Sequence, residues 1–340
     1  MMASAASVRP RDSAKSQILY GVHSDITWNK DPAYRVKEIA TAQALHVEVM
    51  RVGLMWEWIE YRQNKRDWSV MDDVVEKLTR AGITPLLNVS GSPSWANGKA
   101  ERDDPDFYLD VPTDPQLFAR WVREYATFVS FAALRYKGKV RLWELGNEEN
   151  DAYFWRPAPN VDSYITWYLA LRVAIKSVDP SATVALGGLN GLGYDMDRPG
   201  MRGTKFLTGV YERGVHPDAI AIHPYSNRGQ GPDVHVWRAG NFDDIDLVRS
   251  IMIANGQART PIWITEWGWT TDKVSEALQA AYLQKSLALI ESKYACCVAI
   301  ATYYSDIDPT LPYHFGLYTR DFVARPAALV MRQFLAGRRH

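Results

Sequence analysis

Two glutamates, Glu148 and Glu266, each follow a short apolar run and could together perform paired-carboxylate chemistry. Glu148 comes soon after the run at 140–145, and Glu266 comes directly after the run at 261–265. A facing pair of carboxyl groups is what cleavage of a glycosidic bond requires, because one group protonates the leaving oxygen while the other attacks the anomeric carbon or activates water. The pair therefore predicts glycoside hydrolysis, provided that the fold brings these two positions together.

Aromatic residues are abundant around the same positions, with 13 Trp, 18 Tyr and 10 Phe in 340 residues. Sugar rings present flat C–H faces, and these faces stack on large aromatic side chains. We expect substrate contacts from four of the tryptophans that follow apolar runs, namely Trp95, Trp155, Trp267 and Trp269. Tryptophans inside expected helices or strands are instead predicted to fill the core, as with Trp121, Trp143 and Trp167.

Eight short apolar runs alternate along the chain with segments of helical periodicity. Most runs are continuously apolar and do not alternate, which is typical of strands buried in a parallel sheet. The runs lie at 18–22, 47–53, 84–89, 140–145, 183–188, 219–222, 261–265 and 297–303. The helical segments lie at 34–44, 69–81, 114–135, 161–178, 203–213, 243–254, 273–292 and 326–335.

Eight strands that are each followed by a helix predict an α/β fold, a single (β/α)₈ TIM barrel. The alternative is an open doubly wound sheet, which we rank lower because no Gly-x-Gly-x-x-Gly follows the first run. In a barrel the chemistry sits at the C-terminal ends of the strands, so Glu148 and Glu266 would face one cleft. We expect a flexible N-terminal tail over 1–16 and the catalytic barrel over 17–340.

Charge and cysteine content exclude several other classes of protein. The 39 basic and 39 acidic residues balance, which argues against a nucleic-acid or anionic-membrane partner. The two cysteines are adjacent, at Cys296 and Cys297, and no Cys/His pair has zinc-ligand spacing, so we expect no disulfide framework, no metal and no cofactor.

Membrane and targeting signals are also missing from the sequence pattern. No apolar stretch reaches 18 residues, so no membrane span is expected. The segment 1–17 has no apolar run and predicts no signal peptide, which favours a cytoplasmic protein, or a secreted one if a leader preceded the doubled Met1-Met2.

Several of these residues stand in a pattern that resembles clan A retaining glycoside hydrolases, nearest to glycoside hydrolase family 39 and related exopolysaccharide glycosidases. The resemblance spans about 18–336. It is carried by Asn147-Glu148 after Trp-Glu-Leu-Gly at 143–146, by Ile-Thr-Glu-Trp-Gly at 264–268, by His223-Pro224-Tyr225, by Arg51 and by the closing segment at 316–327.

The resemblance implies a double-displacement mechanism on a β-linked oligosaccharide or polysaccharide, with Glu148 as general acid/base and Glu266 as nucleophile. It also implies that Asn147 holds the sugar 2-OH and that Arg51 lies beneath Glu266 and favours its charged form. Residues expected to orient the nucleophile or line the subsite are His223, Tyr225, His23 at the end of the first run, and Tyr303.

Two positions depart from the family pattern. Glu149 stands where proline is common, and Tyr303 with Tyr304 stands where a tryptophan usually forms the floor of the sugar subsite. We expect Glu149 to face solvent or cap the next loop. Glu144, inside the strand, is expected to be a buried partner of Arg51 or His23, because a buried charge is tolerated when it is paired.

Two other functions compete with a glycosidase. A catalytically silent carbohydrate-binding barrel would lack one carboxylate, whereas both are present here. A metal-dependent barrel enzyme would need His, Asp or Glu ligands on neighbouring strand ends, and the sequence does not assemble such a set. The segments 96–111, 191–203 and 226–240 could wall the cleft, and they leave the choice between exo and endo action open.

Overall fold

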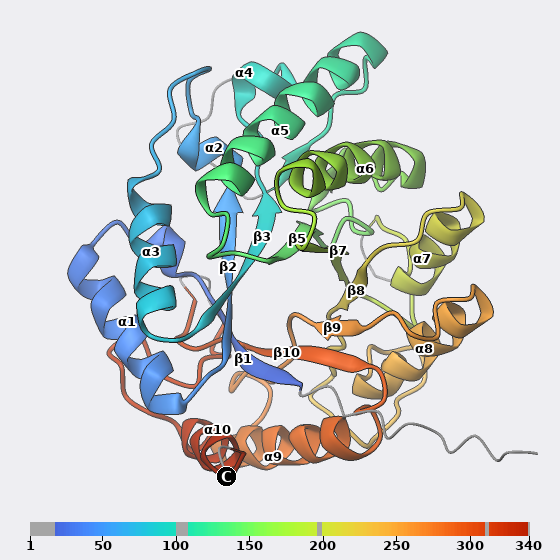
Figure 1. Ribbon diagram of the computed structural model, residues 1–340. Coiled ribbons are helices and arrows are strands. Elements are labelled where there is room, and N and C mark those ends of the chain that lie inside the picture. Colours follow the sequence, from blue (N-terminus) through green and yellow to red (C-terminus); the bar gives the residue numbers. More distant parts are fainter. Residues whose placement is uncertain (1–17, 100–107, 196–198, 310–312, 339–340) are drawn as a thin grey trace, which may run out of the picture.

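The computed structural model describes residues 18–99, 108–195, 199–309 and 313–338, and its centre is a closed barrel of parallel strands (Figure 1). The barrel strands follow one another in chain order, and β1 pairs in parallel with β10 to close the ring. They are β1 Leu19–Ser24, β2 Val49–Met55, β3 Thr84–Ser90, β5 Leu142–Asn147, β7 Thr183–Leu189, β8 Ala219–Ile222, β9 Ile262–Ile264 and β10 Val298–Tyr304. The predicted barrel is therefore confirmed, since an open sheet would leave two unpaired edges.

Helices surround the barrel on its outside (Figure 1). The main helices are α1 Pro32–Leu45, α3 Ser69–Arg80, α5 Pro115–Arg135, α6 Val161–Val178, α7 Gly203–Glu212, α8 Ile245–Ala254, α9 Glu276–Ser292 and α10 Pro326–Ala336. Each matches a predicted segment to within a few residues. The start of α5 follows the predicted pattern, because the Asp114 side chain accepts a hydrogen bond from the Leu117 backbone N–H at 2.8 Å and Pro115 opens the helix.

Short elements were missed because they contain too few residues to show a period. They are α2 Trp56–Ile59, α4 Ser94–Asn97, the 3-10 helices Ile26–Trp28 and Phe242–Asp244, and the strands β4 Leu109–Asp110 and β6 Trp155–Arg156. β4 and β6 pair in parallel outside the barrel. The predicted tail at 1–16 lies outside the described residues. Among the helices that are described, none combines the length and apolar character needed to cross a membrane.

The barrel interior has an apolar layer below a polar one. The apolar layer contains Val49, Leu86, Ala185, Ala219, Ala221, Trp263 and Ile300. Side chains of a strand alternate between its two faces, so the residue two positions further along points into the barrel again. Leu142 of β5 packs against the apolar layer. On six strands the next inward position is polar, and it holds Arg51, Asn88, Glu144, His223, Thr265 and Thr302, all buried. This polar layer forms the base of the C-terminal end of the barrel.

The larger apolar core lies between the strands and the helices. Trp121, Trp143 and Trp167 are buried in it, as predicted. Trp121 and Trp167 stack with ring centroids 6.3 Å apart, which joins α5 to α6. This packing fixes α5 and α6 against one another on the outside of the barrel.

Candidate active site

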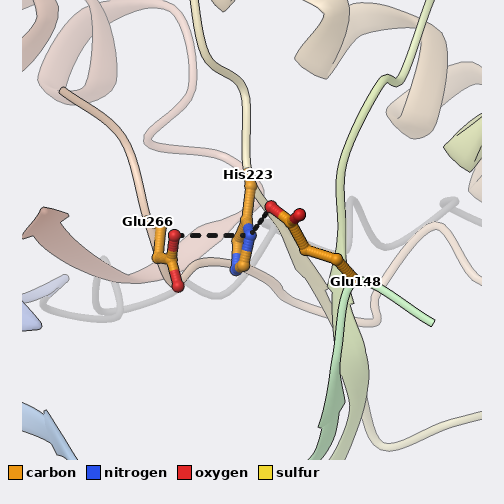
Figure 2. Close-up of side chains that lie close together, drawn as sticks. All are labelled: Glu148, His223 and Glu266. Atoms are coloured by element: carbon orange, nitrogen blue, oxygen red, sulfur yellow. Dashed lines mark hydrogen bonds and ion pairs between the residues drawn. The ribbon is translucent and has the colours of Figure 1, made fainter. Parts of the chain in front are cut away.

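The two predicted catalytic glutamates converge at the C-terminal end of the barrel. Glu148 directly follows β5, and Glu266 lies two residues beyond the end of β9. Figure 2 shows their side chains on either side of His223, which directly follows β8. One oxygen from each carboxyl group and one nitrogen of His223 all lie within 4.8 Å of one another. Residues far apart in the sequence thus share one site.

Donors surround the carboxyl group of Glu266. Arg51 Nη1 donates to its Oε1 at 2.7 Å, and the Tyr225 hydroxyl donates to its Oε2 at 2.9 Å. Burial, and then the charge of Glu266, raise the pKa of Tyr225 well above its ordinary value, so the phenol keeps the proton that it donates. A cation and a phenol therefore face one carboxylate.

Arg51 is the central cation of the polar layer. Its Nε donates to Glu144 Oε2 at 2.5 Å, its Nη2 donates to Asn147 Oδ1 at 2.8 Å, and its Nη1 lies 2.7 Å from His23 Nδ1. Burial alone would lower the pKa of Arg51, but the carboxylates of Glu144 and Glu266 raise it above its ordinary value. The predicted burial of Glu144 beside Arg51 is confirmed.

Glu148 has different neighbours. Its Oε1 lies 2.8 Å from His223 Nδ1, and its Oε2 accepts a hydrogen bond from Asn190 Nδ2. Asn190 is itself held by Asn150, whose Nδ2 donates to Asn190 Oδ1 at 3.1 Å. Burial lowers the pKa of His223 to about 4, so the imidazole is neutral near pH 7. An amide and a neutral imidazole therefore contact this carboxyl group.

Glu149 is not on the surface, which corrects the expectation that it faces solvent or caps a loop. It is buried, and its Oε1 accepts a hydrogen bond from the Asn147 backbone N–H. A Cβ added at Gly146 or Gly187 would lie within 2.6 Å of its carboxyl oxygens, so these two positions require glycine. Burial raises the pKa of Glu149 well above its usual range and so favours the neutral acid, which supports the turn at 146–148 from behind.

The local backbone explains why the Glu149 side chain points into the protein. Gly146 and Glu148 both have left-handed backbone angles, with φ of 95° and 59°. A left-handed residue reverses the local chain direction, and a residue other than glycine adopts it at a cost. The tight turn places Glu148 over the barrel and sends the next side chain into the wall between β5 and β7.

Two cavities meet at the carboxyl pair. One has a volume of about 630 Å³ and the other about 120 Å³, and both are bordered by Glu148, Phe154, Glu266 and Tyr304. The predicted segments 191–203 and 226–240 contribute to the wall of the larger cavity. Among the described residues of 96–111, none borders either of the two cavities.

Six of the predicted site residues beyond the carboxyl pair border these cavities. His23, Arg51 and Asn147 line the smaller one, and His223, Tyr225 and Trp269 line the larger one. His223 was expected to orient Glu266, but it lies closer to Glu148. Its Nδ1 is 2.8 Å from Glu148 Oε1 and 3.6 Å from Glu266 Oε2.

Four predicted aromatic contacts are placed elsewhere. Trp155 packs against the buried rings of α5 and α6, Trp95 donates to the Glu60 backbone oxygen, and Trp267 donates to Ser286. Tyr303 lies edge-on to Trp267, and both are fully buried outside the barrel. None of the four borders the two cavities.

Tyr304 takes the place that was expected for Tyr303. It follows Ile300 and Thr302 at two-residue spacing on β10, so it points into the barrel while Tyr303 points toward the helices. That alternation is visible in the sequence and could have identified Tyr304. Asn190 and Phe154 were also missed, and they lie in irregular segments that carry no such periodic signal.

The carboxyl pair and His223 have the ligand types of a metal site, a set that the sequence did not assemble. However, both oxygens of Glu266 already accept hydrogen bonds, and the Arg51 guanidinium lies 2.7 Å from one of them. A divalent cation bound there would be repelled by the fixed positive charge of the Arg51 guanidinium. The donor set thus fits a free carboxylate better than a metal ligand.

No family model matches the sequence, and the curated proteins include no match. Solved structures do match it. A family 39 glycoside hydrolase from the gut symbiont Bacteroides cellulosilyticus WH2 superposes with a TM-score of 0.71 at 22% identity, over 96% of this chain and 66% of that chain. The GH39 enzyme from Xanthomonas axonopodis pv. citri gives 0.68 at 21% identity, over 95% and 67%.

A third match extends the comparison beyond GH39. GH5_18 from Streptomyces cattleya superposes with a TM-score of 0.66 at 17% identity, over 94% of this chain and 80% of that chain. The present chain spans about two thirds of the length of the two GH39 structures. At these identities the comparisons establish a shared barrel fold.

Proposed function

We propose that this chain is a retaining glycoside hydrolase that cleaves a β-linked glycan by double displacement. The observation that carries the proposal is that one carboxyl oxygen of Glu148 and one of Glu266 lie within 4.8 Å of each other at the C-terminal end of the barrel. Retaining enzymes hold their carboxyl groups about 5–5.5 Å apart, whereas inverting enzymes leave about 6.5–9.5 Å for a water molecule. The short gap supports direct attack by one carboxylate.

Glu266 is assigned as the nucleophile. Its carboxylate attacks the anomeric carbon, the bond to the leaving oxygen breaks, and that oxygen takes the proton of Glu148. Arg51 and Tyr225 support this role, because both donate to Glu266 and hold the charged form in one orientation.

Glu148 is assigned as the general acid and then the base. In the second step its carboxylate takes a proton from water, the resulting hydroxyl attacks the anomeric carbon, and Glu266 is released. The product keeps the original anomeric configuration, because the carbon is inverted twice.

Asn147 and the smaller cavity are assigned to the sugar that is being transferred. Asn147 Oδ1 accepts from Arg51 Nη2 at 2.8 Å, so its amide NH₂ is the group available to a sugar hydroxyl. His23, Arg51 and Asn147 bring polar groups into a space of about 120 Å³. A compact pocket that combines these polar groups with aromatic side chains such as Trp28 and Phe154 suits a single sugar ring.

The test uses a panel of aryl β-glycosides and the full chain. We expect NMR to show the β-anomer as the first product, and a 2-fluoro-2-deoxy glycoside of the preferred sugar to label the peptide that contains Glu266. The Glu266→Ala variant is the control and should remain unlabelled. Formation of the α-anomer, or a label on another residue, would refute the assignment. Glycan binding without any turnover would favour the silent-barrel alternative.

A further inference from the structure

A continuous hydrogen-bonded chain of side chains runs through the polar layer from Arg51 to Glu148. Arg51 Nε donates to Glu144 Oε2 at 2.5 Å, and the Thr265 hydroxyl donates to Glu144 Oε1 at 2.8 Å. Thr265 Oγ1 lies 3.1 Å from His223 Nε2, and His223 Nδ1 lies 2.8 Å from Glu148 Oε1. Glu144, Thr265 and His223 are each at most 1% exposed, so water does not substitute for these partners.

The direction of each hydrogen bond in this chain follows from the first one. Glu144 is paired with the Arg51 guanidinium and therefore accepts. Thr265 has one hydroxyl proton, which it gives to Glu144, so toward His223 its oxygen acts as an acceptor. A neutral imidazole has one N–H, and this contact places it on Nε2. His223 Nδ1 is then a bare acceptor that faces Glu148.

We propose that Thr265 is a positioning residue that, with Glu144, fixes His223 as the Nε2–H tautomer and thereby holds the proton on Glu148 in the resting enzyme. The contact between Glu148 and His223 then consists of a carboxylic O–H that donates to Nδ1. The Asn190 amide donates to the other oxygen of Glu148, which fits its role as the carbonyl oxygen. This inference rests on the proposed function, in which Glu148 is the acid.

The other groups around His223 are compatible with this tautomer. The titratable groups that face it come from β1, β2, β5 and the segments after β5 and β9, and they are His23, Arg51, Glu144, Glu148 and Glu266. Of these, Glu148 is at hydrogen-bond distance from Nδ1, while Glu266 Oε2 lies at 3.6 Å and receives its proton donor from Tyr225. Both oxygens of Glu266 therefore keep a donor, from Arg51 and Tyr225, when Nδ1 of His223 carries no proton.

The groups that face Glu148 itself add no contrary requirement. Besides His223 and Glu266, the titratable groups whose charges interact with Glu148 include Glu149, Tyr225 and Tyr304. Burial raises the pKa values of these three groups well above their ordinary values, which favours the neutral form of each. Loss of the Glu148 proton would thus leave one carboxylate oxygen beside the Nδ1 lone pair, and the Asn190 amide would donate to the other oxygen.

The fixed tautomer helps both catalytic steps. When the leaving oxygen takes the proton, Glu148 becomes a carboxylate that faces an acceptor nitrogen instead of a donor. That carboxylate is less stabilised than one with an N–H at the same place, so it takes a proton from water readily in the second step. An Nδ1–H tautomer would do the opposite and weaken Glu148 as an acid.

The experiment compares the wild-type enzyme with three threonine variants. Thr265→Val removes the hydroxyl, Thr265→Ser keeps it, and Thr302→Val is a matched control. Thr302 is buried in the same polar layer, but its hydroxyl donates to the Thr265 backbone oxygen at 2.7 Å. Nitrogen-15 NMR on histidine-labelled protein reads the tautomer, with His223→Gln used to assign the signal among 7 histidines.

We expect the Nε2–H tautomer at pH 7 in the wild type, in Thr265→Ser and in Thr302→Val, and Nδ1–H in Thr265→Val. The alkaline limb of kcat/KM should move to lower pH in Thr265→Val alone. Nδ1–H in the wild type, or an unchanged tautomer and pH profile in Thr265→Val, would overturn the inference. If Thr265→Val does not fold, the wild-type tautomer decides. The NMR result needs no substrate, so absence of glycosidase activity would refute the proposed function separately.

Discussion

Glu148 and Glu266 carry the same side chain a few ångströms apart, yet their surroundings differ in one consistent way. Glu266 accepts hydrogen bonds from the guanidinium of Arg51 and the phenol of Tyr225. Glu148 contacts the Asn190 amide and an imidazole that burial keeps neutral. Paired carboxyl groups take opposite roles when their environments favour opposite protonation states. The donors on one side and the neutral groups on the other therefore support the proposed roles of Glu266 as nucleophile and Glu148 as acid.

The strongest test of this difference is to delete the Glu266 carboxylate. We expect Glu266→Ala to lower kcat on every aryl β-glycoside by on the order of 10⁴- to 10⁶-fold, because a lost nucleophile affects all substrates alike. Steady-state kinetics over a series of leaving groups measures this. Near-normal turnover of any one of them would place the nucleophile elsewhere.

The effect of removing the Glu148 carboxyl group should depend on the leaving group. We expect Glu148→Ala to slow release of a poor leaving group by ~10²- to 10⁴-fold, and to slow formation of the glycosyl-enzyme from a dinitrophenyl glycoside far less. Azide should restore turnover of the activated substrate and form the β-glycosyl azide. An equal loss on both substrates would remove the distinction between acid and nucleophile.

Arg51 provides the positive charge on the Glu266 side. Arg51→Met should lower the free energy of unfolding by about 3–5 kcal/mol, because it leaves Glu144 buried without its ion-pair partner. Urea denaturation measures the change. Arg202→Met, which removes an exposed pair with Asp195, is the control and should leave the midpoint unchanged within error. A similar stability for both variants would mean that the buried ion pair contributes little.

Tyr225 supplies the second donor. Tyr225→Phe should reduce kcat/KM by ~10- to 100-fold, which corresponds to the loss of a hydrogen bond to a charged group worth about 1.5–3 kcal/mol. Tyr303→Phe is the matched control, since Tyr303 points away from the barrel toward Trp267. If both variants behave alike, the hydroxyl contact with Glu266 is not used in catalysis.

The pH dependence of stability tests the neutral imidazole beside Glu148. Burial lowers the pKa of His223 from 6.5 to about 4, so between these values the unfolded chain binds a proton that the folded chain does not. Stability should therefore fall with falling pH in this window, by up to about 1.4 kcal/mol per pH unit, and level off below it. Guanidinium denaturation from pH 7 to 4 should show a shallower slope for His223→Gln. Parallel slopes would mean that His223 takes up its proton over the same pH range in the folded and the unfolded chain.

The barrel was predictable from the sequence because its signals are local. Continuous apolar runs such as 183–188 and helix starts such as Asp114-Pro115 repeat in order, and the structure contains all eight strands and all eight helices at those places. The candidate pair was also predictable from the sequence, because Glu148 and Glu266 stand at strand ends, and in a barrel all such ends meet at one face.

The contacts around that pair were decided by tertiary structure alone. Trp155, Trp267 and Tyr303 looked like substrate contacts, but they pack behind the strands, while Tyr304 and Phe154 border the cavities. The cause is side-chain direction, which a single residue in the register reverses.

Sequence by itself determined the barrel, the face that holds the candidate site and the two carboxyl groups on it, because each depends on residue type and local spacing. Only the tertiary structure decided which carboxyl group meets Arg51, where Glu149 points and how Thr265, His223 and Glu148 connect. These are contacts between residues tens to hundreds of positions apart. Their geometry depends on how the strands close into a ring, and no local pattern records it.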